Sequence, residues 1–145
     1  MAHRVFGGRH LTRDETETLL KEAKIARFCS LNRDGTIHAA PVWFKYENGK
    51  IVTITPDNSI KAKNIKRNKN VTVLIDETTP KTRTALIIGT AEITHKDTLA
   101  ATISICEKYM PKETAKRSAE ALYPKTKWAK ITVKPKHITS FDYPS

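Results

Sequence analysis

Apolar and β-branched side chains alternate with polar ones in several stretches of the chain, which is the period-two pattern of half-buried strands. The pattern predicts six strands, at residues 26–31, 36–46, 50–55, 71–75, 84–93 and 128–143. Asp34-Gly35 separates the first two, and this dipeptide between β-rich runs is typical of a tight hairpin. Short strands joined by frequent turn signals favour a small closed barrel.

A second pattern, with apolar residues three and four positions apart, predicts helices between these strands. The helical stretches are residues 11–24, 58–68, 96–108 and 111–122. Thr12 and Glu15 form a capping-box pair at the start of the first, and the side chain of Asn58 or Ser59 can cap the second. We therefore expect a β-rich α+β fold.

Proline and glycine interrupt three of the predicted strands. Pro41 cannot donate a hydrogen bond to a β-ladder, so it marks an edge, a bulge or a gap. A gap is a place where a planar ligand can meet exposed backbone. Gly89 indicates a bend or a close approach of another strand, and Pro135 indicates a kink.

Cations are concentrated in the helix at residues 58–68, which follows directly after a strand. Residues three or four apart share a helix face, so Lys63, Lys66 and Arg67 form one basic face and Lys61 lies apart from it. A lysine in the first turn of such a helix suits a phosphate, because the free amide groups and the helix dipole are both positive there. Because the segment has no glycine-rich loop, the spacing alone does not distinguish a phosphate site from an ordinary solvated surface of lysines.

Composition places the chain among intracellular globular proteins. Its 145 residues are the size of one domain, so we expect a single domain over residues 1–145. Two cysteines exclude a disulfide scaffold and suit a reducing compartment. The N-terminal residues resemble no secretory signal and no apolar run approaches a membrane span, so we expect a cytoplasmic protein.

The net charge of +11 is compatible with polyanions or phosphorylated ligands. The cations are scattered along the chain, which favours lysine-based solubility over one binding patch. The run from Lys61 to Lys69 contains no aromatic residue, and this argues against single-stranded nucleic acid as a ligand. The five histidines lack metal-ligand spacing, and no nucleophile or Walker motif is present.

The motif Thr55, Ser59, Lys61 and Asn64-Ile65-Lys66-Arg67-Asn68 resembles the core of the pyridoxamine 5'-phosphate oxidase-like, FMN-binding split-barrel family. The resemblance extends through the hairpin at residues 26–50, the strand at residues 83–93 and the final strand. It implies a six-stranded split β-barrel with flanking helices. It also implies a homodimer of two barrels with ligands at their interface, and flavin chemistry supplied by the cofactor.

The resemblance also implies roles for individual residues. Those expected at the isoalloxazine ring are Pro41, Val42 and Trp43, with Trp128 near its edge. Those expected along the ribityl chain and phosphate are Ile54, Thr55, Ser59, Ile60 and Lys61. Thr84 matches a position that is often glutamine and reaches the flavin from the other subunit; threonine is shorter.

Two departures from the oxidase itself bear on the substrate. Ala39 stands where the oxidase has a phosphate-binding arginine, and the C-terminal segment lacks its Arg-x-His sequence. The resemblance therefore supports flavin binding better than pyridoxamine phosphate oxidation. We expect an FMN-binding oxidoreductase of unidentified substrate, reduced by a nicotinamide or deazaflavin donor.

Two alternatives stay open on the sequence. The first is a reductase that uses a deazaflavin coenzyme in place of FMN, because that branch of the family resembles this chain in its lysine-bearing helix. The second is a non-enzymatic binding module, a basic barrel that holds haem or RNA.

Overall fold

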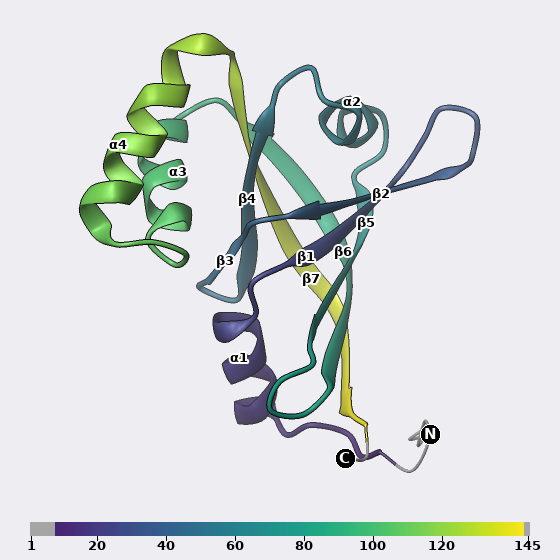
Figure 1. Ribbon diagram of the computed structural model, residues 1–145. Coiled ribbons are helices and arrows are strands. Elements are labelled where there is room, and N and C mark those ends of the chain that lie inside the picture. Colours follow the sequence, from purple (N-terminus) through teal and green to yellow (C-terminus); the bar gives the residue numbers. More distant parts are fainter. Residues whose placement is uncertain (1–7, 144–145) are drawn as a thin grey trace.

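The computed structural model describes residues 8–143, and within them it contains one seven-stranded antiparallel sheet and four α-helices (Figure 1). The strands are β1 (Ala26–Leu31), β2 (Ile37–Val42), β3 (Lys45–Glu47), β4 (Lys50–Pro56), β5 (Asn70–Glu77), β6 (Arg83–Thr94) and β7 (Trp128–Asp142). The helices are α1 (Arg13–Glu22), α2 (Ile60–Arg67), α3 (Thr98–Cys106) and α4 (Lys112–Leu122), followed by a 3₁₀ turn, Tyr123–Lys125.

The sheet has the strand order β2-β1-β5-β6-β7-β4-β3, so its two edge strands are consecutive in the chain. Every neighbouring pair is antiparallel. The sheet curls until the chain passes directly from the β2 edge to the β3 edge (Figure 1). The barrel is therefore split between β2 and the β3–β4 pair, and the predicted split-barrel fold is confirmed.

The strand predicted at residues 36–46 is two strands, which makes seven strands where the sequence predicted six. β2 pairs with β1 and β3 pairs with β4, while Trp43 and Phe44 between them belong to neither ladder. The break follows from the crossing between the two edges, a long-range event that alternation along the sequence does not encode. Pro41 lies in β2, an edge strand, and an edge was one of the three places predicted from its missing amide hydrogen.

Helices close the two ends of the barrel and cover one side of it (Figure 1). Leu19 and Leu20 of α1 are buried in the main core, together with Phe28, Phe44 and strand residues such as Ile87. The capping box at Thr12 and Glu15 is present, as predicted. α2 packs on β1 and β6, whereas α3 and α4 pair with each other and α3 packs on β4 and β7. No helix within residues 8–143 is long and apolar enough to cross a membrane.

The two longest strands, β6 and β7, approach each other closely at a bulge. The register shifts between Ile88 and Gly89. A Cβ atom at Gly89 would lie 2.3 Å from the carbonyl oxygen of Lys134 and 3.2 Å from Pro135 Cα. The predicted close approach at Gly89 is therefore confirmed, and Pro135 lies on the opposing strand at the same point.

Candidate functional site

A pocket of about 330 Å³ lies at the split of the barrel. β3 pairs only with the first three residues of β4, Lys50 to Val52, so the rest of β4 has no neighbour on that side. β2 has an unpaired edge as well. The pocket is lined by the end of β2 and the end of β4, so two unpaired strand edges border it. Backbone groups that pair with no other strand are thus available to a ligand.

Seven of the ten predicted site residues line this pocket. They are Pro41, Val42, Trp43, Ile54, Thr55, Lys61 and Trp128. The opposite wall comes from the helical pair, which the sequence did not connect with the site. Its residues are Thr102, Ile105, Cys106 and Leu122. These side chains come from segments that are distant in sequence from β2 and β4, so no motif spacing joins them to the site.

Lys61 is the only charged side chain in the pocket lining of the described residues. It is half-buried, and burial lowers the pKa of its ammonium group. Within residues 8–143 its ammonium group has neither an ion pair nor a hydrogen-bond partner. It lies in the first turn of α2, which contains no acidic residue. A desolvated cation at the positive end of a helix dipole is unfavourable without an anion beside it.

Hydroxyl groups connect β4 to the start of α2. Thr55 is almost fully buried, and its hydroxyl donates to Ser59 Oγ at 2.9 Å. Ser59 is the N-cap, as one of the two predicted alternatives, and its Oγ also accepts from the amide of Ala62 at 3.2 Å. Since Ser59 Oγ accepts both bonds, its own hydrogen is left to donate. Ser59 and Ile60 adjoin the pocket through the chain, although neither is part of its lining.

The turn between β4 and α2 is held by Asp57. Its carboxylate accepts hydrogen bonds from His95 Nε2 at 2.7 Å and Lys66 Nζ at 2.9 Å. These bonds lower the pKa of Asp57 to about 2, the bond from His95 being the largest cause. The Asp57 amide also donates to the Lys127 carbonyl oxygen at 2.9 Å, just before β7. The turn that precedes Lys61 is thereby held by residues at the end of β6 and at the start of β7.

The basic face predicted for α2 is mostly engaged in structural contacts. Lys66 pairs with Asp57, and Arg67 donates to the carbonyl oxygen of Leu31 and to Asn64 Oδ1 at 2.7 Å. Asn64 is buried and donates in turn to Ser30 and Asn32. Lys63 alone of this face is exposed without a side-chain partner among the described residues. The separation of Lys61 from these cations is confirmed.

Trp43 forms the part of the pocket wall that bridges the two strand edges. Its indole is 44% exposed and stacks on the ring of Tyr109, with centroids 4.2 Å apart and planes at 8°. Its carbonyl oxygen accepts from Thr53 Oγ1 at 2.7 Å, across the split. Tyr109 was not foreseen, because it lies beyond the end of α3 and no local pattern distinguishes it.

Thr84 does not join the pocket within one chain. It is buried in β6 opposite Asp76 and Phe141, and its hydroxyl donates to the Ile75 carbonyl oxygen at 3.4 Å. The expectation that it reaches a ligand in a second subunit stays a prediction.

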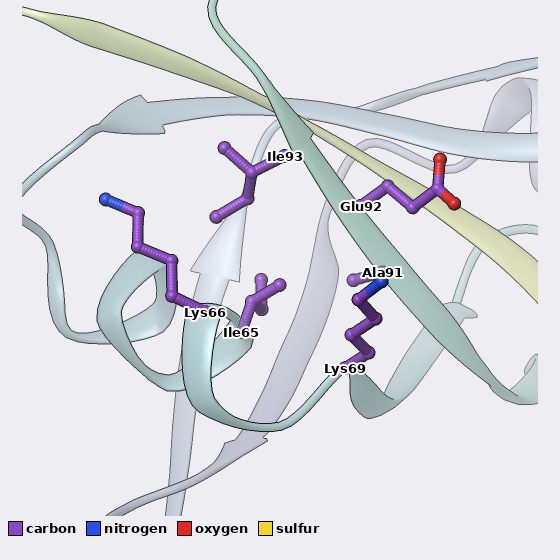
Figure 2. Close-up of a pocket in the computed structure, with 6 residues that line it drawn as sticks. All are labelled: Ile65, Lys66, Lys69, Ala91, Glu92 and Ile93. Carbon is purple, nitrogen blue, oxygen red and sulfur yellow. The ribbon is translucent and has the colours of Figure 1, made fainter.

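A separate hollow of about 320 Å³ lies between α2 and β6. Figure 2 shows Lys66 and Lys69 on either side of Ile65, with Glu92 pointing away from them. Lys66 is already paired with Asp57. No group of three or more potential metal-ligating side chains is found among residues 8–143. The pocket at the split is therefore the place where the predicted residues and an unpaired charge coincide.

Solved structures with low sequence identity share this fold. A conserved hypothetical protein from Mycobacterium tuberculosis superposes with a TM-score of 0.79 at 21% identity, over 91% of this chain and 85% of that protein. An F420 reductase superposes with a TM-score of 0.67 at 20% identity, over 84% of this chain and 94% of the reductase. An FAD-binding protein from Mesorhizobium loti gives 0.70 at 13% identity, over 94% and 99% respectively.

No curated protein is detectably similar to the chain in sequence. The family profile of pyridoxamine 5'-phosphate oxidase, in contrast, matches residues 12–135. The matched segment begins at the N-cap of α1 and ends within β7, so it includes all the residues that line the pocket at the split. Because the match extends over most of its length, the chain belongs to the pyridoxamine 5'-phosphate oxidase family.

Proposed function

We propose that the pocket at the split binds FMN and that the protein is a flavin-dependent oxidoreductase. The observation that carries this proposal is Lys61, a half-buried cation without a partner among the described residues, at the N-terminus of α2 beside an apolar slot. A planar, apolar ligand with one anionic group fits both features, because its anion pairs with Lys61 and its flat part fills the apolar slot. FMN has this shape, with a phosphate at one end and an isoalloxazine ring at the other.

The remaining residues fit the proposed orientation of the cofactor. Ser59 has a hydroxyl hydrogen to donate toward the phosphate, beside the free amide groups of the first turn of α2. Trp43 and Trp128 offer flat apolar surfaces for the ring, and the unpaired edge of β2 offers backbone groups for its polar rim. Bound flavin would supply the hydride chemistry, while these residues bind it, orient it and exclude water.

A deazaflavin coenzyme is the second candidate for the same pocket. It shares the phosphate and the tricyclic ring shape, and one of the structures with this fold is an F420 reductase. Reduced nicotinamide or reduced deazaflavin would be the electron donor. We place the protein in the cytoplasm, a reducing compartment consistent with its two unpaired cysteines.

Titration of the protein with FMN and with a deazaflavin coenzyme tests the proposal. Removing the charged partner of a phosphate costs on the order of 1.5–3 kcal/mol. Lys61→Ala should therefore raise the Kd of FMN roughly 10–100-fold. Lys63→Ala, an exposed lysine on the same helix, is the matched control and should change the Kd less than twofold or so.

If Lys61→Ala and Lys63→Ala weaken FMN binding equally, Lys61 acts only through general electrostatic attraction and forms no specific phosphate site. Absence of binding by the unaltered protein to either coenzyme would contradict the proposal itself. Tighter binding of the deazaflavin than of FMN would favour the second candidate.

We further propose that pyridoxamine 5'-phosphate is not the substrate. Lys61 is the one charged side chain in the pocket lining of the described residues, and the phosphate of bound FMN would already pair with its ammonium group. A phosphorylated substrate beside the ring needs an anion site of its own. We expect turnover of pyridoxamine phosphate by the FMN-loaded protein to stay well below roughly 1 per second, measured as pyridoxal phosphate formation. Sustained turnover above that rate would contradict this part of the proposal.

We also propose a homodimer, formed through the outer face of the sheet. Leu31 pairs with Ile37 across β1 and β2, and both side chains are exposed. Cys29, Thr72 and Ile88 are aligned across β1, β5 and β6 on the same face and line a groove with them. Ile37 is 72% exposed and Ile88 is 47% exposed, which is costly for a lone barrel. A second copy would cover these side chains.

A further inference from the structure

The two residues at the break between β2 and β3 depend on contacts outside the sheet. Trp43 and Phe44 have no ladder partner, yet Phe44 is fully buried and its backbone amide and carbonyl need hydrogen bonds. The amide donates to the hydroxyl of Tyr109 at 3.1 Å. The carbonyl oxygen lies 3.3 Å from Lys108 Nζ and 3.2 Å from the same hydroxyl. Lys108 and Tyr109, which follow α3, therefore supply hydrogen-bond partners for the backbone amide and carbonyl of Phe44 at the break.

Tyr109 contacts the break in two different ways. Its hydroxyl accepts from the Phe44 amide and donates its single hydrogen to a carbonyl oxygen, the shorter contact being to Lys24 at 2.7 Å. Its ring stacks nearly parallel on the indole of Trp43. Burial raises the pKa of the phenol, so the hydroxyl keeps its hydrogen at neutral pH. One side chain thus joins the segment between α1 and β1, the break and the pocket wall.

Neighbouring contacts hold the same end of α3 against the break. Lys108 Nζ lies 3.7 Å from the centroid of the Phe44 ring, and Lys45 Nζ donates to Ser104 Oγ at 3.0 Å. α3 also contributes Thr102, Ile105 and Cys106 to the pocket lining. The wall from β2 and the wall from α3 are therefore linked through Tyr109 and its neighbours.

We propose that Tyr109 is a positioning residue: by stacking on Trp43 and bridging the break, it fixes the indole as a preformed wall for the cofactor ring. The inference rests on the proposed function of the pocket. Trp43 has one ring face against Tyr109, and it lines the pocket as well. A wall held in place before binding spares the ligand the entropy cost of ordering it.

The stack and the hydroxyl bridge make separable contributions. Tyr109→Phe keeps the stack but leaves the buried Phe44 amide without its partner, and we expect a rise of roughly 3–10-fold in the Kd of FMN. Tyr109→Leu removes both contacts, and we expect a rise of roughly 10–100-fold. Tyr123→Phe, at an exposed tyrosine outside the pocket lining, should leave the Kd unchanged.

Iodide quenching of tryptophan fluorescence in the apoprotein reports the indole without any ligand. The chain has two tryptophans, so a Trp128→Phe background leaves Trp43 as the single emitter. In that background Tyr109→Leu should increase quenching of Trp43, and Tyr109→Phe should leave it close to the parent. Leu19→Ala, on the buried face of α1, removes core packing at a residue outside the pocket lining, so it lowers stability and controls for general loosening.

Two results would overturn the inference. One is unchanged quenching of Trp43 in Tyr109→Leu. The other is an FMN Kd in Tyr109→Leu that rises no more than in Leu19→Ala. If the unaltered protein binds neither FMN nor a deazaflavin, the proposed function fails, and the quenching result alone then decides whether Tyr109 fixes Trp43.

Discussion

At the scale of single residues, the turn between β4 and α2 holds two charges in opposite circumstances. Asp57 accepts hydrogen bonds from the side chains of His95 and Lys66, whereas Lys61 is half-buried and has no ion pair among the described residues. The first arrangement stabilises the turn by itself. The second becomes favourable when an anion arrives, which is why we assign binding to Lys61 and support to Asp57.

The support by Asp57 should depend on pH. Its pKa is lowered from 3.8 to about 2, first by the bond from His95 and then by the bond from Lys66. A lowered carboxyl pKa contributes stability that is present above about 3.8 and is lost as the pH falls toward 2. Asp57→Asn should lower the Tm by about 2–4 °C at pH 7, a modest value because both partners of the carboxylate, Lys66 and His95, are exposed to solvent.

The same substitution should have little effect near pH 2, where the carboxyl of the parent protein is itself becoming protonated. Thermal unfolding of parent and variant at both pH values measures the difference. Glu92→Gln is the control, because this exposed carboxylate on β6 has no ion pair among the described residues. A Tm difference for Asp57→Asn that is equal at both pH values would contradict the assigned cause.

At the scale of elements, β6 and β7 form the long pair to which the rest of the sheet is attached. Their bulge at Gly89 brings the two backbones so close that only hydrogen fits at this α-carbon. β7 also pairs with β4, whose last residues line the pocket. The glycine is therefore required by packing between strands.

Replacing this glycine should destabilise the protein, although the same change often stabilises others. Alanine in place of glycine usually helps by reducing the entropy of the unfolded chain. In Gly89→Ala the new Cβ would lie 2.3 Å from the Lys134 carbonyl oxygen, so the strands must separate. We expect a loss of about 1–3 kcal/mol in the free energy of unfolding, measured with urea. Glu92→Ala in the same strand is the control, and a stabilised Gly89→Ala would refute this account.

At the scale of the whole molecule, the outer face of the sheet carries a group of exposed apolar side chains, Leu31, Ile37 and Ile88. The proposed dimer would cover them, and Ile37 is the most exposed of the group. In Ile37→Lys the dimer would have to bury an unpaired charge at its interface, which is strongly unfavourable. We therefore expect the variant to sediment as a monomer in sedimentation velocity experiments.

Ile138→Lys is the matched control for this experiment. Ile138 is also exposed, but it lies in a different hollow beside α1. It should leave the oligomeric state unchanged. A monomeric parent protein that still binds FMN would contradict the dimer, and with it the expected contribution of Thr84 from a second subunit.

The amino-acid sequence by itself determined the features that depend on near neighbours. The turn at Gly35, the capping box at Thr12, the cap at Ser59 and the bounds of β1 follow from local hydrogen bonding and side-chain alternation. The distinct position of Lys61 on α2 follows from helical spacing. Such signals are readable because the interacting groups lie within a few residues of each other.

Only the tertiary structure decided which distant segments meet. The division of one predicted strand at Trp43, the wall contributed by α3 and α4, and the stack with Tyr109 all join residues far apart in the chain. The bond from His95 to Asp57 spans 38 positions and likewise left no local pattern. These contacts arise when the curled sheet brings its two edges together, and alternation or spacing along the chain carries no record of that closure.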